Sequence, residues 1–165
     1  MSYIIFSLLT APGVVLHELG HLLFCLLAGV KVFRVKFFGF GKTAGFVEHA
    51  EPDGFIQSLF ISFGPLTLNS LVSLILFSQI TPPYFTWLHA LEIWIGFASA
   101  LHAIPSNGDA HTLMLISTKK IRKNPLAIAG YPFVLTIYLL NFLKRFHLQF
   151  LYAILLFWLG SSYLK

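Results

Sequence analysis

Residues 4–28 have the sequence IIFSLLTAPGVVLHELGHLLFCLLA, and this stretch decides which solvent surrounds the chain. It is apolar and exceeds the roughly 20 residues that a membrane-spanning helix needs. Near its middle it carries His17, Glu18 and His21. Charged groups at membrane depth cost several kcal/mol, so their presence indicates a function. In a signal peptide, basic residues precede the apolar run, and none precede it here. We therefore expect residues 4–28 to remain in the protein as a membrane helix.

The composition of the whole chain also favours a membrane protein. Of the 165 residues, 57% are hydrophobic and 10% are charged, and the mean hydropathy is +0.81, unlike a soluble globular protein. The formal net charge is +5. The basic residues form short clusters between apolar runs, as in juxtamembrane loops, so we expect no nucleic-acid partner. The single cysteine excludes an intrachain disulfide, and the apolar content excludes intrinsic disorder.

Five stretches approach or reach the length of a membrane span. They are residues 4–28, 55–77, 85–104, 125–143 and 148–164. Pro82 and Pro83 predict a tight turn after the second span, whereas Pro105 ends the third, which can continue as a bent helix over residues 111–117. Residues 31–53 alternate loosely between apolar and basic side chains and contain three glycines. This pattern predicts a β-hairpin at the membrane surface. We therefore expect an all-α integral membrane protein with about five transmembrane helices and a small hairpin after the first.

The basic residues predict an orientation, because cytoplasmic loops collect Lys and Arg. One basic group follows the first span and another follows the third: Lys31, Arg34, Lys36 and Lys42, then Lys119, Lys120, Arg122 and Lys123. Five spans place both groups on the same side, which we expect to be cytoplasmic. Lys144 and Arg145 then fall on the outer side. Either they reach an interface by snorkelling, or the last two spans form a shallow hairpin.

His17-Glu18-Leu19-Gly20-His21 is an HExxH motif inside an apolar helix. Two histidines four residues apart lie on one helix face and can bind a single zinc ion, and Glu18 is placed to take a proton from water at that metal. Zinc lowers the pKa of its water to about 7 and polarises a carbonyl. We predict one zinc ion per chain, although iron or cobalt suits the same donors. The structural alternative is a histidine pair that forms hydrogen bonds between helices.

A catalytic zinc site needs a third protein ligand, and Asp109 fits best. Pro105 and Gly108 interrupt the helix beside it, and irregular backbone at membrane depth is tolerated where it lines a wet cavity. The alternative role of Asp109 is to cap a helix that begins at Ala110. Other residues remain open as ligands or as partners of the ligands: Cys25, Glu92, His102 and His111.

The second predicted span contains the sequence SFGPLTLN at residues 62–69. Gly64 and Pro65 let another helix approach and free a backbone carbonyl. Asn69 supplies an amide that can hold the backbone of a peptide substrate. As a bare pattern this motif is weak, and its value lies in its position between the HExxH motif and Asp109.

Over about residues 10–115 the chain resembles the site-2 proteases, a family of intramembrane zinc metalloproteases, as a minimal and divergent member. That family has an HExxH helix, a short β segment, a helix with a Gly-Pro and Asn motif, and a helix with a third zinc-binding Asp. The resemblance implies that His17, His21 and Asp109 bind zinc, that Glu18 is the catalytic base and that Asn69 helps to hold substrate. The chain departs from the family at two points, since its motif is GPxxxN rather than GPxxN and Gly108 precedes Asp109 rather than following it.

The resemblance implies a zinc-dependent endopeptidase that cleaves transmembrane segments of membrane-protein substrates, with its active site toward the cytoplasmic side. We expect residues 1–165 to form one membrane-embedded domain, with a catalytic core at about 4–117 and accessory helices at about 125–164. The hairpin region, residues 31–49, either pairs with an unwound substrate or anchors the protein at the interface. Two other functions remain open: a non-proteolytic zinc-binding membrane protein, such as an inactive protease relative, metal sensor or carrier, and a membrane zinc hydrolase of a small substrate.

Overall fold

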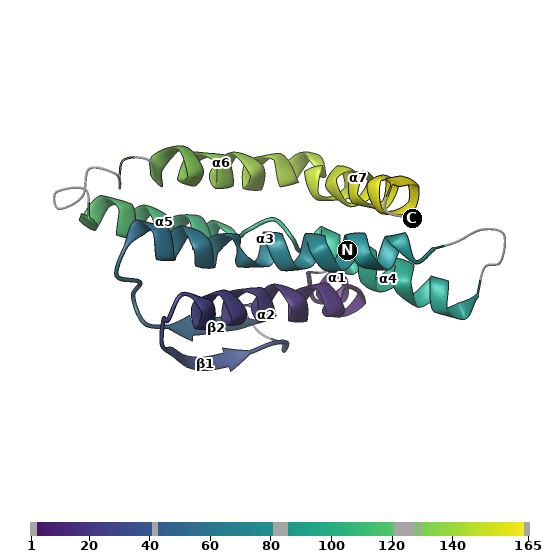
Figure 1. Ribbon diagram of the computed structural model, residues 1–165, viewed down its shortest axis with the longest axis horizontal. Coiled ribbons are helices and arrows are strands. Elements are labelled where there is room, and N and C mark those ends of the chain that lie inside the picture. The colour runs from purple at the N-terminus through teal and green to yellow at the C-terminus, as the bar shows by residue number, and fades with distance from the viewer. Residues whose placement is uncertain (1–2, 41–42, 81–85, 121–127, 129, 164–165) are drawn as a thin grey trace.

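The structure is a computed structural model that describes residues 3–40, 43–80, 86–120, 128 and 130–163. The described chain is mostly helical and contains one small sheet (Figure 1). Its elements are α1 (Tyr3–Leu9), α2 (Ala11–Leu27), β1 (Val32–Lys36), β2 (Phe46–His49), α3 (Phe55–Ser78), α4 (Trp87–Leu101), α5 (Asn107–Lys120), α6 (Gly130–Leu143), the short 3-10 helix η2 (Lys144–Phe146) and α7 (Leu148–Tyr163). The predicted turn at Pro82 and Pro83 and the basic positions Lys42, Arg122 and Lys123 lie outside the described residues.

Helix α3 is at the centre of the molecule and contacts α2, α4, α5 and α7. In Figure 1, α2 and the sheet lie on one side of α3, and α6 and α7 lie on the other. The crossing of α2 with α3 is very close at Gly20, where an added Cβ would lie 2.8 Å from the Cα of Pro65. Small residues let helix backbones approach in lipid, where hydrophobic burial does not drive association. The predicted role of the Gly64-Pro65 pair in admitting another helix is confirmed.

The first predicted span is not one continuous helix. The chain breaks at Thr10 into α1 and α2, because Pro12 has no amide hydrogen to donate to the turn before it. Pro12 lies in the first turn of α2, where a missing donor costs nothing. Helix α2 therefore has 17 residues and is shorter than the roughly 20 residues that cross a bilayer.

Two helical segments are long and apolar enough to cross a membrane, Phe55–Ser78 and Trp87–Lys119. The second joins α4 to α5 across the break at Pro105, as the sequence predicts. The segments Gly130–Phe146 and Leu148–Ser162 pass the same test only as a pair, bent by 95°. The bend follows from the tight 3-10 turn and from the left-handed conformation of His147, whose φ is 62°. The described residues are consistent with a membrane protein of two to three spans, and the prediction of about five is not confirmed.

The predicted β-hairpin is confirmed. Strands β1 and β2 pair antiparallel, with Val35 opposite Val47, Lys36 opposite Phe46, and a bulge after Val32. Both strands contact α2, and they lie beside it in Figure 1. The hairpin therefore covers the helix that carries the HExxH motif.

Candidate metal centre

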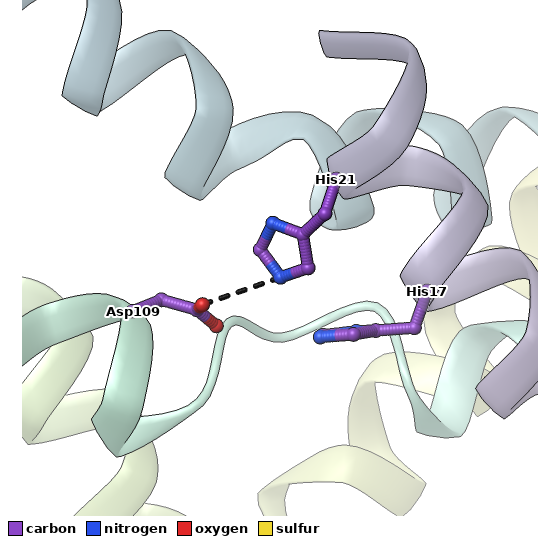
Figure 2. A group of neighbouring side chains, drawn as sticks. All are labelled: His17, His21 and Asp109. Atoms are coloured by element: carbon purple, nitrogen blue, oxygen red, sulfur yellow. Dashed lines mark ion pairs between the residues drawn. The ribbon is translucent and has the colours of Figure 1, made fainter. Parts of the chain in front are cut away.

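The structure brings the three predicted metal ligands together. His17 and His21 come from α2, and Asp109 comes from the first turn of α5 (Figure 2). One ligand atom from each residue lies within 4.8 Å of the other two. The closest pair is His21 Nε2 and Asp109 Oδ1, which are 3.2 Å apart. Two atoms bound to the same tetrahedral zinc ion lie about 3.4 Å apart, so this group can hold one metal ion.

Backbone carbonyls orient both imidazole rings. His17 Nδ1 lies 2.7 Å from the carbonyl oxygen of His102, and His21 Nδ1 lies 3.2 Å from that of Ile61. A carbonyl oxygen only accepts hydrogen bonds, so each Nδ1 carries a proton and donates it. In a neutral ring, Nε2 then keeps its lone pair for a metal ion, which is the usual arrangement of zinc-binding histidines.

The contact between His21 and Asp109 needs a positive charge. If the His21 ring is neutral, its Nε2 lone pair faces a carboxylate oxygen at 3.2 Å, and two acceptors at that distance repel each other. Either a second proton on His21 or a bound cation resolves the repulsion. His17 lies in the same group, and a metal ion uses all three residues, whereas a proton on His21 uses two.

Asp109 divides its two oxygens between the helix start and the candidate metal site. Its Oδ2 accepts hydrogen bonds from the backbone nitrogen of Ser106 at 2.6 Å and from the Ser106 hydroxyl at 2.8 Å. Helix α5 begins at Asn107, so Ser106 is the N-cap and Asp109 is the third helical residue, as in a capping box. The alternative that Asp109 caps a helix starting at Ala110 is wrong. The cap instead orients the carboxylate so that Oδ1 faces His21.

A cavity of about 530 Å³ contains this group. Glu18 lines it together with the three candidate ligands, and the residue is only 8% exposed. The other wall comes from the hairpin and the residues before β2, including Ala44 and Gly45. The Gly45 backbone packs directly against Glu18, the predicted catalytic base. An added Cβ at Gly45 would lie 2.6 Å from Glu18 Cγ. The motif helix and the hairpin therefore line the same cavity.

The other candidate ligands lie outside the metal-binding group of the described residues. His102 lines the cavity, but its Nε2 lies 2.8 Å from the Thr10 hydroxyl, and its contribution to the site is the carbonyl that holds His17. Cys25 is fully buried among apolar residues, as expected of a small hydrophobe. Glu92 and the exposed His111 do not line the cavity.

Asn69 is fully buried and does not line the cavity. Its side-chain nitrogen lies 3.4 Å from the carbonyl oxygen of Gly13 in α2. Its Oδ1 has no hydrogen-bond partner among the described residues. The structure thus places Asn69 at the contact between α2 and α3, and its predicted role in holding substrate stays a prediction.

Two residues with ionisable side chains line the cavity although the sequence did not indicate them as site residues. His49, at the end of β2, and Lys144, in the bend between α6 and α7, both line it. A signal for Lys144 was available, since this lysine lies between two apolar runs and does not fit the predicted orientation. His49 carries no such signal, because it lies in a hairpin whose position over α2 is a tertiary feature.

Comparison of the chain with models of known protein families, with curated proteins and with solved structures found no match. The assignment of a function therefore rests on the chemistry of the candidate metal centre.

Proposed function

We propose that this protein is a zinc-dependent intramembrane endopeptidase that cleaves transmembrane segments of membrane-protein substrates. The observation that carries the proposal is the grouping of His17, His21 and Asp109, with both Nδ1 atoms held by backbone carbonyls. Three protein ligands leave a fourth position for water, as in catalytic zinc sites. Glu18 beside them favours an enzyme over a metal carrier, sensor or inactive relative, because a binder has little use for a general base.

The proposed reaction is hydrolysis of a peptide bond. When bound, zinc would polarise the scissile carbonyl and acidify the attacking water. Glu18 would accept a proton from that water and deliver it to the leaving amine nitrogen. A bond forms between the water oxygen and the carbonyl carbon as the C–N bond breaks, giving an acid and an amine.

The hairpin supports a peptide substrate. Phe46, Val47 and His49 of β2 line the cavity, and among the described residues β2 pairs with β1 alone. A strand with one free edge can pair with an extended peptide. This matters because a helical peptide bond is shielded by its own hydrogen bonds and must be unwound before hydrolysis. A zinc hydrolase of a small substrate has no need of such an edge.

The proposed orientation places the site toward the cytoplasmic side. Lys119 Nζ, at the end of α5, lies 2.9 Å from Glu51 Oε1, just after the hairpin. This ion pair supports the expectation that the basic groups after the first and third predicted spans lie on the same side, because it joins the two regions directly. Cytoplasmic loops are rich in Lys and Arg, and Asp109 lies in the first turn of α5, the helix that ends at Lys120.

The test compares wild-type protein with Glu18→Gln and with Glu48→Gln, an exposed residue of β2. Each is purified in detergent, assayed for zinc and incubated in vesicles with a model transmembrane peptide that contains helix-breaking residues. We expect about one zinc per chain in all three and a loss of cleavage of at least about 100-fold in Glu18→Gln alone. Equal cleavage by wild type and Glu18→Gln would contradict the mechanism.

The same assay separates the other two functions. Wild-type protein that binds zinc but cleaves no membrane peptide would favour the non-proteolytic binder. Glu18-dependent hydrolysis of a lipid or small ester without peptide cleavage would favour the small-substrate hydrolase.

A further inference from the structure

The break between α4 and α5 is held by side chains from two directions. On one side, His17 donates to the carbonyl oxygen of His102 at 2.7 Å. On the other, Asn141 Nδ2 donates to the carbonyl oxygen of Pro105 at 2.8 Å, and Lys144 Nζ donates to that of Ile104 at 3.1 Å. Non-helical backbone at membrane depth needs such partners. The end of α6 therefore supports the segment that positions Asp109.

Lys144 differs from Asn141 because it brings a charge into the metal cavity. It lines the cavity with His17 and Asp109, and it is the sole Lys or Arg among the described residues that do so. Its ammonium group has three N–H donors, and among the described residues one hydrogen-bond partner is found for it, Ile104. A neutral amide, as in Asn141, holds a backbone carbonyl without the cost of a charge at this depth. Support of the linker, the break between α4 and α5, therefore does not by itself explain why residue 144 is a lysine.

The charges that line the cavity favour binding of an anion. The other titratable residues that line it are His17, Glu18, His21, His49, His102 and Asp109. With both carboxylates ionised and the imidazoles neutral, a zinc dication balances the carboxylates. Lys144 then leaves one excess positive charge, which a bound anionic oxygen would neutralise.

We infer that Lys144 forms an anion-binding position in the metal cavity and holds a negatively charged oxygen of the substrate. The inference rests on the proposed function. Two sources of that oxygen share the chemistry: the scissile carbonyl oxygen as it becomes negative during attack, and the terminal carboxylate of a bound peptide. Charge-assisted hydrogen bonds to such oxygens are stronger than neutral ones. In the first case Lys144 is a catalytic residue, and in the second it selects substrates with a free C-terminus.

The test measures binding of two phosphinic peptides, in which a tetrahedral phosphinate replaces the scissile amide. They are identical except that one ends in a carboxamide and the other in a free carboxylate. Binding to the full-length zinc-loaded protein in detergent is measured by calorimetry for wild type, Lys144→Met, Lys144→Arg and Asn141→Leu. The Asn141→Leu variant is the matched control, because it also removes a hydrogen bond to the linker but changes no charge.

We expect Lys144→Met to retain about one zinc per chain and to bind the blocked phosphinic peptide about 10- to 100-fold more weakly. Lys144→Arg keeps most of the affinity, and Asn141→Leu stays within about threefold of wild type. Weakening of the free-acid peptide alone by Lys144→Met also supports the anion position and identifies the carboxylate as its ligand. Wild-type affinity of Lys144→Met for both peptides would overturn the inference, as would loss of zinc from this variant, which indicates a positioning role.

These measurements need no turnover. A protein that binds zinc and the phosphinic peptides with this dependence on Lys144, but cleaves no membrane peptide, contradicts the proposed function and leaves the anion position standing. Wild-type protein that binds zinc but neither peptide contradicts the anion position itself.

Discussion

His21 Nε2 lies 3.2 Å from Asp109 Oδ1, and this contact joins the HExxH helix to the first turn of α5. Each partner is oriented by a second contact, His21 by the carbonyl of Ile61 and Asp109 by the cap at Ser106. The two groups are therefore held in place from both sides without a bound metal ion. Such preorganisation is typical of metal sites, where outer partners orient the ligands.

Asp109 is expected to be essential for zinc binding. Asp109→Asn keeps an oxygen that can accept from Ser106, and so preserves the cap, but it removes the anionic ligand. We expect zinc, measured by elemental analysis of purified protein, to fall from about one per chain to below about 0.1. Glu92→Gln is the control and should keep its zinc. The reverse pattern, with zinc lost from Glu92→Gln and kept in Asp109→Asn, would make Glu92 the third ligand.

Removal of zinc should destabilise the protein. Without a cation, a neutral His21 faces Asp109 as one acceptor against another, and a ligand that binds the folded state alone adds stability. We expect a chelator to lower the thermal midpoint of the wild-type protein in detergent by about 5–10 °C. Asp109→Asn should show no such shift. Identical melting of the wild type with and without chelator would indicate a protonated His21 in place of a metal.

Gly20 should be intolerant of any side chain. An added Cβ would lie 2.8 Å from both the Cα and the nitrogen of Pro65, so α2 and α3 must separate. We expect Gly20→Ala to lower the free energy of unfolding by about 1–3 kcal/mol, measured by denaturation in mixed micelles. Gly54→Ala is the control because its Cβ meets no atom within 4 Å. Equal stability of the two variants would show that the helix contact is looser than described.

Gly45→Ala should impair cleavage without loss of zinc. The new methyl group would lie 2.6 Å from Glu18 Cγ and 2.9 Å from the carbonyl oxygens of Lys36 and Phe37. The hairpin backbone cannot yield easily, so Glu18 must move away from its working position. We expect a decrease of about tenfold or more in cleavage rate, with about one zinc per chain retained. A rate equal to that of the wild type would mean that Glu18 is not held by the hairpin.

Asn69 should affect stability more than substrate binding. Its amide contacts the Gly13 carbonyl and its side chain does not line the cavity. We expect Asn69→Ala to lower the free energy of unfolding by about 1 kcal/mol and to change KM for a membrane peptide by less than about twofold. A raised KM with unchanged stability would support the substrate-holding role that the family resemblance implies.

Much of the candidate site was predictable because polar and charged residues cost free energy within apolar segments and are rare there without a function. His17, Glu18 and His21 interrupt an apolar run, and the 3.6-residue period places the two histidines on one helix face. Asp109 was predictable from the nearby Pro105 and Gly108, which interrupt the helix, because irregular backbone at membrane depth is tolerated where it lines a cavity. The hairpin was predictable from its change of period. The number of spans was not, because hydropathy does not reveal that Pro12 breaks the first run or that the last two runs share a bend.

The amino-acid sequence by itself indicated a membrane environment and determined the HExxH helix, the hairpin and the choice of Asp109 as the third candidate ligand, since each of these follows from local composition and spacing. Only the tertiary structure decided that the carbonyls of Ile61 and His102 orient the two rings, that Gly45 lies over Glu18, and that Lys144 reaches the cavity. The physical reason is that these are contacts between segments far apart in the chain. They depend on how closely helices cross and where the last pair bends, and no local pattern encodes either.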